Sequence, residues 1–486
     1  MSILQRNRKK AIALGVVVFG TCAAHLAAVS SSRMTPPQIA VNALPESATD
    51  DSDGIRRLGA NYTQIVEGVR EVYLTGSPEE IGTAHARLLR DRMIADEGEV
   101  WGDFSKFVPV SLARTLMMDV GRVRYRHVDD GVPEARRREL AAQANAFQPD
   151  PFSDRMPTYE RMMFLHSLYD IALSFEHSPL LGCSAFGLGP DRTKDGHALM
   201  ARAFDFEAGE MYDRDKAVYF VAENGAIPFA SVAWPGMVGV LSGMNLEGVS
   251  VVVNGGRARE PRVSGEPVIF TLRDVLQNAH DTNEAIAILS KQDVMVSHIV
   301  LVGDASGHFA VVERAPGEPA FVRENKDDSR VAVTNHFEGP LASDPKNLTV
   351  ERKTTTLPRR AKLDEMLARV DEKQADVSSV VAMLRDHTCA SSVGPCDLGD
   401  RRAIDPFIAT HGIVADDTAR VLWVSAGPHL SGKFVSFDLK KIFAKDHDPI
   451  SDRSAPTIDE DPAMRDGRMV QGEKRAGGPK FGGDKP

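Results

Sequence analysis

The strongest constraint on this chain is a change of hydrophobic period at Gly182-Cys183. Residues 162–175 space their apolar side chains as an amphipathic helix does, whereas the residues from Ser184 onward alternate as in a strand. The fold must therefore join an α-rich part to a β-rich part at a single cysteine. We interpret this junction as a cleavage point that makes Cys183 a new N-terminus and a catalytic nucleophile.

The first residues of the chain carry an export pattern. Residues 1–30 combine a basic start with the apolar run 11–29, which predicts either a cleaved secretory signal or an uncleaved membrane anchor. Residues 31–57 are rich in Ser, Pro and Asp and predict a flexible linker. We therefore expect an exported protein that is periplasmic, extracellular or anchored in a membrane and facing outward.

Segment 58–182 is predicted to be mostly helical and to become the small chain after cleavage. A short strand ends at Gly76, and Ser77-Pro78-Glu79-Glu80 forms a capping box that opens a helix from 78 to about 95. Further helical patterns cover 109–128, 133–147 and 157–176.

Segment 183–445 is the predicted catalytic part. Its first six strands are expected to form an antiparallel meander, because only short turns separate them; they are 184–189, 197–206, 216–223, 228–234, 238–245 and 248–255. Later helical patterns cover 271–290, 358–370 and 376–387, and later strands cover 297–304, 308–315, 330–336, 420–425 and 433–438. This order predicts an α+β fold with two antiparallel sheets and helices outside them. The charged tail 446–486 is predicted to be disordered.

Export changes how the four cysteines are counted. If Cys22 leaves with the signal, three remain, and an odd number leaves one thiol unpaired in an oxidising compartment. Cys389 and Cys396 flank a turn-rich loop and are the candidate disulfide. The remaining thiol is then Cys183, and a buried inert cysteine is the alternative to a nucleophile.

Charge and motifs exclude several classes of function. The chain has 58 Lys and Arg against 68 Asp and Glu, a net charge of −10 without a basic stripe, which argues against nucleic acid as the partner. No Walker loop, dinucleotide fingerprint or zinc spacing occurs. We expect no metal and no cofactor.

A cysteine at a new N-terminus can supply both groups that acyl chemistry needs. Its α-amine titrates at about 7.7 to 8.0 and its thiol at about 8.5, so one residue holds the base and the nucleophile. Glycine at position 182 admits backbone conformations that are closed to other residues, which favours attack by the thiol on the Gly182 carbonyl.

Two segments carry a resemblance to a known family. Gly182-Cys183-Ser184-Ala185-Phe186 and Arg202-Ala203-Phe204-Asp205-Phe206 resemble the start of the mature chain in N-terminal-nucleophile hydrolases. The match is strongest to the autoproteolytic acyltransferases typified by acyl-coenzyme A:6-aminopenicillanate acyltransferase, and choloylglycine hydrolases are more distant. The resemblance extends over roughly residues 65–440 and implies an αββα sandwich of two antiparallel sheets between helical layers.

The resemblance also implies residue roles. Cys183 matches the nucleophile and Gly182 its cleavage partner, while Arg202 and Asp205 match a pair beside the nucleophile. The alternative for that pair is a local salt bridge at a turn. Asn254 matches the side-chain amide that polarises the scissile carbonyl, and an Asn-Gly turn is its alternative.

Two further positions rest mainly on the resemblance. Asn335 matches an asparagine that lines the site of choloylglycine hydrolases, and Arg359 matches an arginine that opens a helix and reaches the site. Arg360 offers a second register for that arginine. The family often has a serine near this helix start, where this chain has Thr355 and Thr356.

The expected reaction is attack of the Cys183 thiolate on an acyl compound. Water would complete a hydrolase cycle, and an amine would complete an acyltransferase cycle. Export favours hydrolysis of a small N-acyl amide. We expect the two cleaved chains to remain associated and residues 11–29 to serve as a membrane attachment. Two rival hypotheses remain. One is an uncleaved exported binding or scaffold protein with the same fold, and the other is a Cys–His hydrolase that uses His197 or His336 without cleavage.

Overall fold

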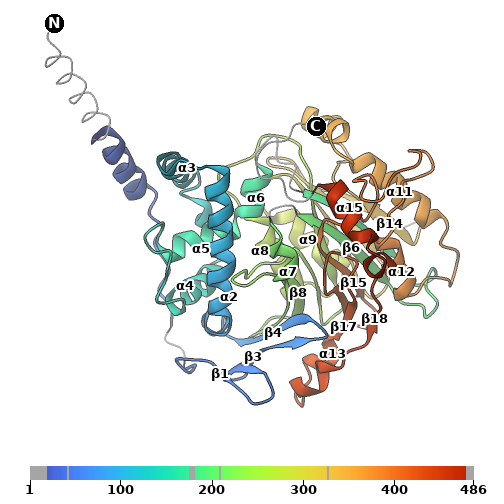
Figure 1. The fold of residues 1–486 in the computed structure, drawn as a ribbon, viewed down its shortest axis with the longest axis horizontal. Coiled ribbons are helices and arrows are strands. Elements are labelled where there is room, and N and C mark those ends of the chain that lie inside the picture. Colours follow the sequence, from blue (N-terminus) through green and yellow to red (C-terminus); the bar gives the residue numbers. More distant parts are fainter. Residues whose placement is uncertain (1–18, 41–42, 175–180, 207–208, 326–327, 478–486) are drawn as a thin grey trace, which may run out of the picture.

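The computed structural model describes residues 19–40, 43–174, 181–206, 209–325 and 328–477. Two β-sheets lie face to face, and helices cover both outer faces (Figure 1). Three apolar clusters fill the spaces between these layers. The αββα sandwich and the α+β class expected from the sequence are therefore confirmed.

The larger sheet has eleven strands. Its neighbours are antiparallel except for β4 and β7, which are parallel. In spatial order the strands are β1 (Thr49–Asp50), β2 (Arg56–Leu58), β3 (Asn61–Val66), β4 (Val69–Gly76), β7 (Ala217–Glu223), β8 (Phe229–Ala233), β9 (Ser242–Asn245), β10 (Ser250–Gly255), β11 (His298–Gly303), β12 (Phe309–Arg314) and β13 (Phe321–Glu324). The segment before Cys183 thus supplies four strands of this sheet and not helices alone.

The smaller sheet has seven antiparallel strands and carries Cys183. In spatial order they are β14 (Arg330–Val333), β5 (Leu181–Leu188), β6 (Leu199–Phe206), β15 (Ala409–Asp416), β16 (Val421–Ser425), β17 (Phe434–Asp438) and β18 (Thr457–Ile458). The expected six-strand meander is therefore wrong. β5 and β6 belong to this sheet and β7 to β10 to the other, because side-chain alternation assigns the faces of a strand and not its neighbours.

Helices form the two outer layers. Those packed on the larger sheet are α2 (Pro78–Phe107), α4 (Glu134–Ala146), α5 (Thr158–His166), α6 (Leu168–Leu173), α8 (Val268–Asn278) and α9 (Thr282–Lys291). Those on the smaller sheet are α11 (Thr356–Ala368) and α12 (Val377–Leu384). The remaining helical segments are α3 (Ser111–Arg124), η1 (Val128–Gly131), α7 (Met211–Arg214), α10 (Pro345–Lys353), α13 (Leu439–Ile442), η2 (Pro449–Arg453), α14 (Pro462–Arg465) and α15 (Arg468–Ala476).

Capping residues explain where several helices begin. The predicted capping box of α2 is confirmed: the Glu80 N–H donates to Ser77 Oγ, and the Ser77 N–H donates to Glu80 Oε2 at 2.8 Å. The single helix expected over 271–290 is wrong. It is divided into α8 and α9, because the Asp281 carboxylate accepts the Glu284 N–H at 2.9 Å and starts a new helix.

Two segments expected to lack structure are partly ordered. In 31–57, β1 pairs with β2, and in 446–486, β18 pairs with β17 and precedes α14 and α15. Ala463 and Ala476 are buried there, a tertiary contact that local composition does not reveal. Residues 41–42 and 478–486 lie outside the described part of the chain.

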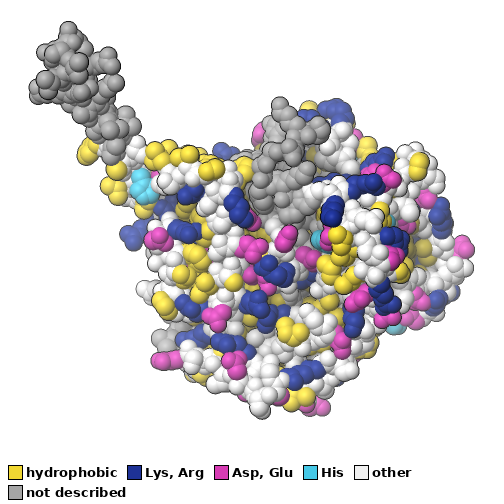
Figure 2. All heavy atoms as spheres, in the orientation of Figure 1, with side chains coloured by type: hydrophobic (Ala, Val, Ile, Leu, Met, Phe, Trp, Pro, Cys, Tyr) yellow, Lys and Arg dark blue, Asp and Glu magenta, His cyan; other side chains and the backbone are white. Residues whose placement is uncertain are grey.

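Residues 11–18 of the apolar run 11–29 also precede the described residues, which begin at 19. Residues 19–31 form a helix that projects from the body of the molecule (Figure 1), and Figure 2 shows hydrophobic side chains on the surface of this projection. Of the helices in the described part, none is both long and apolar enough for a bilayer span.

A buried charge network joins the α-rich segment to the catalytic segment. Arg273 on α8 contacts Glu139 on α4 and Glu223 on β7, each at 3.0 Å, and Arg136 on α4 bonds both carboxylates. The side chains of Arg273 and Glu139 are each 1% exposed. Removing one partner would leave an uncompensated charge in the interior.

We predict that Glu139→Ala lowers the free energy of unfolding by about 3 kcal/mol, because Arg273 loses a buried counter-charge. Chemical denaturation measures the change. The matched control is Asp293→Ala, which breaks an exposed pair with Arg262 (2.6 Å) and should cost less than about 1 kcal/mol. Equal losses in the two variants would contradict a structural role for the network.

Candidate active site

Strand register decides which side chains surround Cys183. β5 and β6 pair Cys183 with Phe204 and Gly182 with Asp205. Directly paired residues share a face, so Cys183, Arg202 and Phe204 point between the two sheets, whereas Gly182 and Asp205 point to the other face. Arg202 and Asp205 therefore act on opposite sides of β6, which is not the local turn salt bridge considered as an alternative.

Arg202 holds a positive charge beside the thiol. It is fully buried, and its Nη2 donates to Cys183 Sγ at 3.6 Å. Its other contacts are with the larger sheet: Nη1 donates to the Leu241 carbonyl at 3.0 Å, and the guanidinium also bonds Ser242 and Val253. Since both sheets fix this guanidinium, the cation is already in place when negative charge develops on the sulfur.

Side chains hold both backbone groups of Cys183. The Cys183 N–H donates to Asn335 Oδ1 at 2.8 Å, and the Cys183 carbonyl accepts from Arg359. Arg359 also donates to Asn335 Oδ1 at 2.8 Å, while Asn335 Nδ2 donates to the Gly255 carbonyl at 2.9 Å. Burial lowers the pKa of Arg359, and the negative charge of Asp205 opposes that shift. We call Asn335 and Arg359 the backbone clamp.

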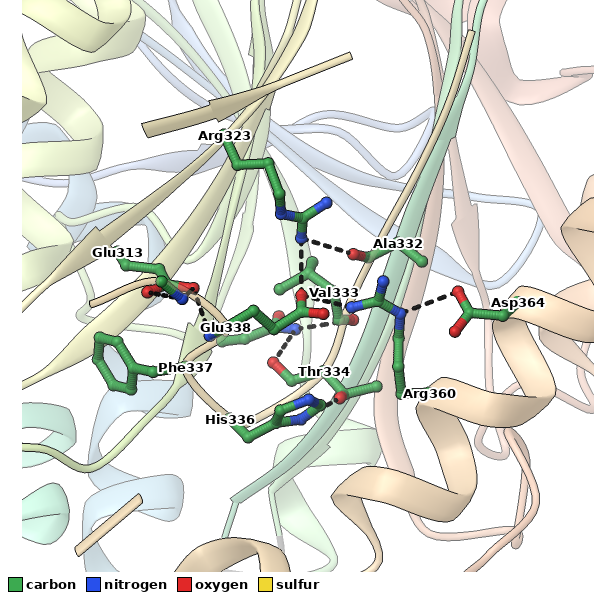
Figure 3. Close-up of polar contacts among 12 residues, drawn as sticks. Glu313, Arg323, Ala332, Val333, Thr334, His336, Phe337, Glu338, Arg360 and Asp364 are labelled. Atoms are coloured by element: carbon green, nitrogen blue, oxygen red, sulfur yellow. Dashed lines mark hydrogen bonds and ion pairs between the residues drawn. The ribbon is translucent and has the colours of Figure 1, made fainter. Parts of the chain in front are cut away.

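Arg359 and Arg360 have different partners, which resolves the register left open by the sequence. Figure 3 shows Arg360 directed to Glu338 and to Asp364, with Arg360 Nε 2.9 Å from the Asp364 carboxylate. Arg323 donates to the same Glu338 carboxylate at 2.8 Å. These ion pairs hold the loop after β14, which carries Asn335, against the start of α11. Arg359, not Arg360, reaches Cys183.

A threonine supplies a hydroxyl near the helix start. The Asn335 N–H donates to Thr356 Oγ1 at 2.8 Å, and that hydroxyl donates to Thr334 Oγ1 at 2.9 Å. His336 Nδ1 lies 3.0 Å from the same oxygen, and burial lowers the pKa of His336. Thr356 thus helps to orient the loop that holds Asn335, a contribution that the missing serine had left in doubt.

Asn254 does not present the donor expected of it. It is fully buried at the end of β10, and its Nδ2 donates to the carbonyls of Thr334 (3.0 Å) and Val333 (3.4 Å). The amide oxygen has no hydrogen-bond partner among the described residues. Because the amide hydrogens are directed at the end of β14, the oxyanion role needs another donor in this arrangement.

Tyr169, which the sequence analysis missed, offers such a donor. It lies on α6, and its buried hydroxyl has no hydrogen-bond partner in the described structure. Burial raises its pKa well above the usual value, and the neighbouring Cys183 raises it further, so the hydroxyl keeps its proton. A helical pattern predicts α6 but not which of its residues faces the cysteine.

An apolar cavity of about 130 Å³ adjoins this face of the sheet. Tyr169 and Phe204 line it, and Phe204 is the residue paired with Cys183. Helices before the cysteine and strands after it both contribute walls; the other lining residues include Met93, Asp96, Glu97, Val100, Met162, Leu165, Phe206, Met211, Tyr212, Trp234, Leu241 and Ile269. The cavity therefore depends on both parts of the chain.

The histidines proposed for a Cys–His pair lie elsewhere. His197 precedes β6 and bonds Asp416 at 2.8 Å. It lies seven residues before Phe204, the residue paired with Cys183, which corresponds to roughly 20 Å along the strand. His336 is bonded to the threonine hydroxyls. In the described residues, no histidine hydrogen-bonds to Cys183.

The cysteines divide as a disulfide and two free thiols. Cys389 and Cys396 form a disulfide with their Cα atoms 5.6 Å apart. Cys183 is free and buried, and Cys22 is free and exposed.

Comparison with known families places most of these residues in one domain. Residues 192–394 match the model of the family described as acyl-coenzyme A:6-aminopenicillanic acid acyl-transferase. This segment is similar to a domain of that family. It contains Arg202, Asp205, Asn254, Asn335 and Arg359. It begins after Cys183 and covers less than half of the chain, so the nucleophile itself rests on the geometry described above.

The matched segment and the αββα layers resemble those of N-terminal-nucleophile amidohydrolases and acyltransferases. An uncharacterized protein of Archaeoglobus fulgidus is 26% identical over 255 residues, which cover 49% of this chain and 41% of that protein. The chain thus matches less than half of the length of this archaeal relative.

Solved structures of similar fold include three amide-cleaving proteins. A Caenorhabditis elegans ortholog of N-acylethanolamine-hydrolyzing acid amidase is 18% identical, with a TM-score of 0.36 over 49% of this chain and 93% of the other. Penicillin V acylase from Agrobacterium tumefaciens (15%, TM-score 0.38) covers 53% and 87%, and a conjugated bile acid hydrolase from Clostridium perfringens (14%, TM-score 0.38) covers 57% and 97%. At these values they place no residue and no substrate in this chain.

We predict that Arg359→Ala increases the rate of Cys183 alkylation by iodoacetamide about tenfold, because the buried thiol loses the clamp on its carbonyl. Peptide mass spectrometry measures labelling, and circular dichroism checks the fold. Arg369→Ala, at the other end of α11, removes an exposed ion pair with Glu365 but no contact with Cys183 or with the loop that carries Asn335, and should stay within about twofold of wild type. Equal acceleration in both variants would contradict the clamp.

Proposed function

We propose that this protein is an exported, self-cleaving cysteine amidohydrolase that acts on a small N-acyl amide. Cleavage between Gly182 and Cys183 would create two chains that stay associated. The observation that carries the proposal is the environment of Cys183: its N–H donates to Asn335, its thiol lies beside Arg202, and Phe204, the residue paired with it, lines an apolar cavity. The family domain at 192–394 supports acyl chemistry of this type.

Self-cleavage begins with attack of Cys183 Sγ on the Gly182 carbonyl carbon. The C–N bond between the two residues breaks as a C–S bond forms, the Cys183 nitrogen takes the thiol proton, and water then hydrolyses the thioester. Glycine at 182 supports this step, since a Cβ there would lie 3.0 Å from Asp205 Oδ2. A side chain at residue 182 would therefore crowd the Asp205 carboxylate beside the scissile bond.

Turnover uses the amine that cleavage releases. The side-chain oxygen of Asn335 (Oδ1) accepts one hydrogen of the Cys183 amine. The lone pair of that nitrogen can then take the proton of the thiol. The thiolate attacks the substrate carbonyl, and the leaving amine receives the proton from the Cys183 ammonium. Water then attacks the thioester, releases the acid and restores the thiol. Tyr169, with a hydroxyl that keeps its proton, donates to the oxyanion in both steps.

The cavity favours an apolar group next to the reactive carbonyl, because its lining is mostly Met, Leu, Phe, Tyr and Trp. Hydrolysis is preferred to transfer on the export pattern of the sequence. The Cys389–Cys396 disulfide supports an oxidising compartment, outside the cytoplasm and either free or attached through residues 11–29.

We expect Cys183→Ala to abolish N-acyl amide hydrolysis and to remain a single chain, because it lacks the nucleophile of both reactions. Product release and denaturing electrophoresis measure the two effects. The control removes the disulfide: Cys389→Ser with Cys396→Ser should still split and retain turnover, at a cost of about 2.5 kcal/mol in stability. A Cys183→Ala protein that still divides into two fragments would refute self-cleavage by this thiol.

For Tyr169→Phe we expect kcat to fall by about a hundredfold with KM nearly unchanged, because an oxyanion donor acts mainly in the transition state. Steady-state kinetics gives both constants. Tyr159→Phe is the matched control: Tyr159 also has a buried hydroxyl without a described partner, but it does not line the cavity. Equal loss in both variants, or a change confined to KM, would exclude the role given to Tyr169.

A further inference from the structure

One wall of the cavity carries a carboxyl group that the proposed reaction does not use. Asp96 lies in the middle of α2, is 4% exposed and lines the cavity. Neither of its oxygens accepts a hydrogen bond from an N–H or hydroxyl group of the described residues, and the side chain facing it within hydrogen-bond reach is another carboxyl, that of Asp215. Its neighbour Glu97 also lines the cavity but is satisfied, since it binds Arg161 at 2.5 Å and Trp101 at 3.0 Å. A buried carboxyl without a donor is costly to retain unless a ligand supplies one.

The surroundings of Asp96 favour a cation as that ligand. Its charged neighbours are Asp215, Arg92, Arg214 and Arg70, and Arg92 and Arg214 are already bound to Asp215, at 3.2 and 2.7 Å. Burial and the Asp215 charge raise the pKa of Asp96 to about 7.

The adjacent tyrosine reports the same negative charge. Tyr212 lines the cavity beside Asp96, and its pKa is raised by burial and then by three carboxylates, those of Asp96, Asp103 and Glu99. Asp103 and Glu99 are bound to Lys106 and Arg214, at 2.8 and 2.9 Å, and Asp215 is bound to two arginines, whereas Asp96 has no such ion pair among the described residues. A positively charged donor would offset the repulsion, whereas a second anion would add to it.

We propose that Asp96 binds an ammonium group on the substrate, so that the cavity accepts an apolar acyl chain ending in a protonated amine. The aliphatic chain packs among the Met, Leu and aromatic residues, and its ammonium group donates to the free carboxylate oxygens. This assignment rests on the proposed function, because it names the acyl group of the same reaction.

The test compares matched anilides. The ω-aminohexanoyl and heptanoyl p-nitroanilides have chains of equal length, of which the first ends in an ammonium group and the second in a methyl group. Two further pairs vary the chain length: the ω-aminobutanoyl and ω-aminooctanoyl compounds, each with its methyl-ended counterpart. Wild type should prefer the amino member of at least one pair by at least about tenfold in kcat/KM. That preference should increase as pH rises from about 6 to about 8, since Asp96 ionises in this range while the ammonium stays charged.

Two variants separate charge from shape. Asp96→Leu should reverse the preference and retain or improve turnover of the methyl-ended anilide, whereas Met93→Leu, one turn away on the same cavity wall, should keep the preference of wild type. Equal use of both members at all three lengths, or a preference that survives Asp96→Leu, overturns the proposal.

A binding measurement makes failure of this inference distinct from failure of the reaction. Calorimetry of hexylammonium and of hexanol with Cys183→Ala protein needs no turnover. Tighter binding of hexylammonium that Asp96→Leu abolishes supports the ammonium site even if no anilide is cleaved. Equal binding of both probes overturns the site, while Cys183-dependent cleavage of heptanoyl anilide would leave the proposed hydrolase activity standing.

Discussion

The hydrogen bond from the Cys183 N–H to Asn335 Oδ1 is the contact on which the rest of the site depends. It fixes a nitrogen on β5, just beyond the end of the edge strand β14, that would become the catalytic amine under the proposed cleavage. Arg359 fixes the carbonyl of the same residue, and the ion pairs of Glu338 hold the loop that carries Asn335. The thiol can then project between the sheets, where Arg202 lies beside it.

Several features that depend on neighbouring residues or on hydrophobic periodicity could be predicted from the sequence. The capping box at Ser77 and the strand that follows Cys183 come from local patterns, although this strand, β5, begins before the cysteine, at Leu181. The division of the meander between two sheets does not come from such patterns, because strand partners are chosen by tertiary packing. For the same reason, the sequence did not reveal the position of Tyr169 or the orientation of Asn254. The first depends on how α6 packs near Cys183, and the second on how the end of β14 packs against Asn254.

The segment before Cys183 is part of the active site and not only a leader for it. It adds four strands to the larger sheet, contributes α2 and α6 to the cavity, and is joined to the catalytic segment by buried charges. A cut after Gly182 would therefore release a backbone bond without releasing the segment. The cavity that selects the substrate would keep both of its walls.

The most direct test of the central claim is the intact mass of wild-type protein after brief exposure to an N-acyl anilide. We predict two chains, of which the larger begins at Cys183 and carries one acyl group that peptide mapping places on the Cys183 sulfur. A single unmodified chain, or an acyl group on any other residue, would contradict the account.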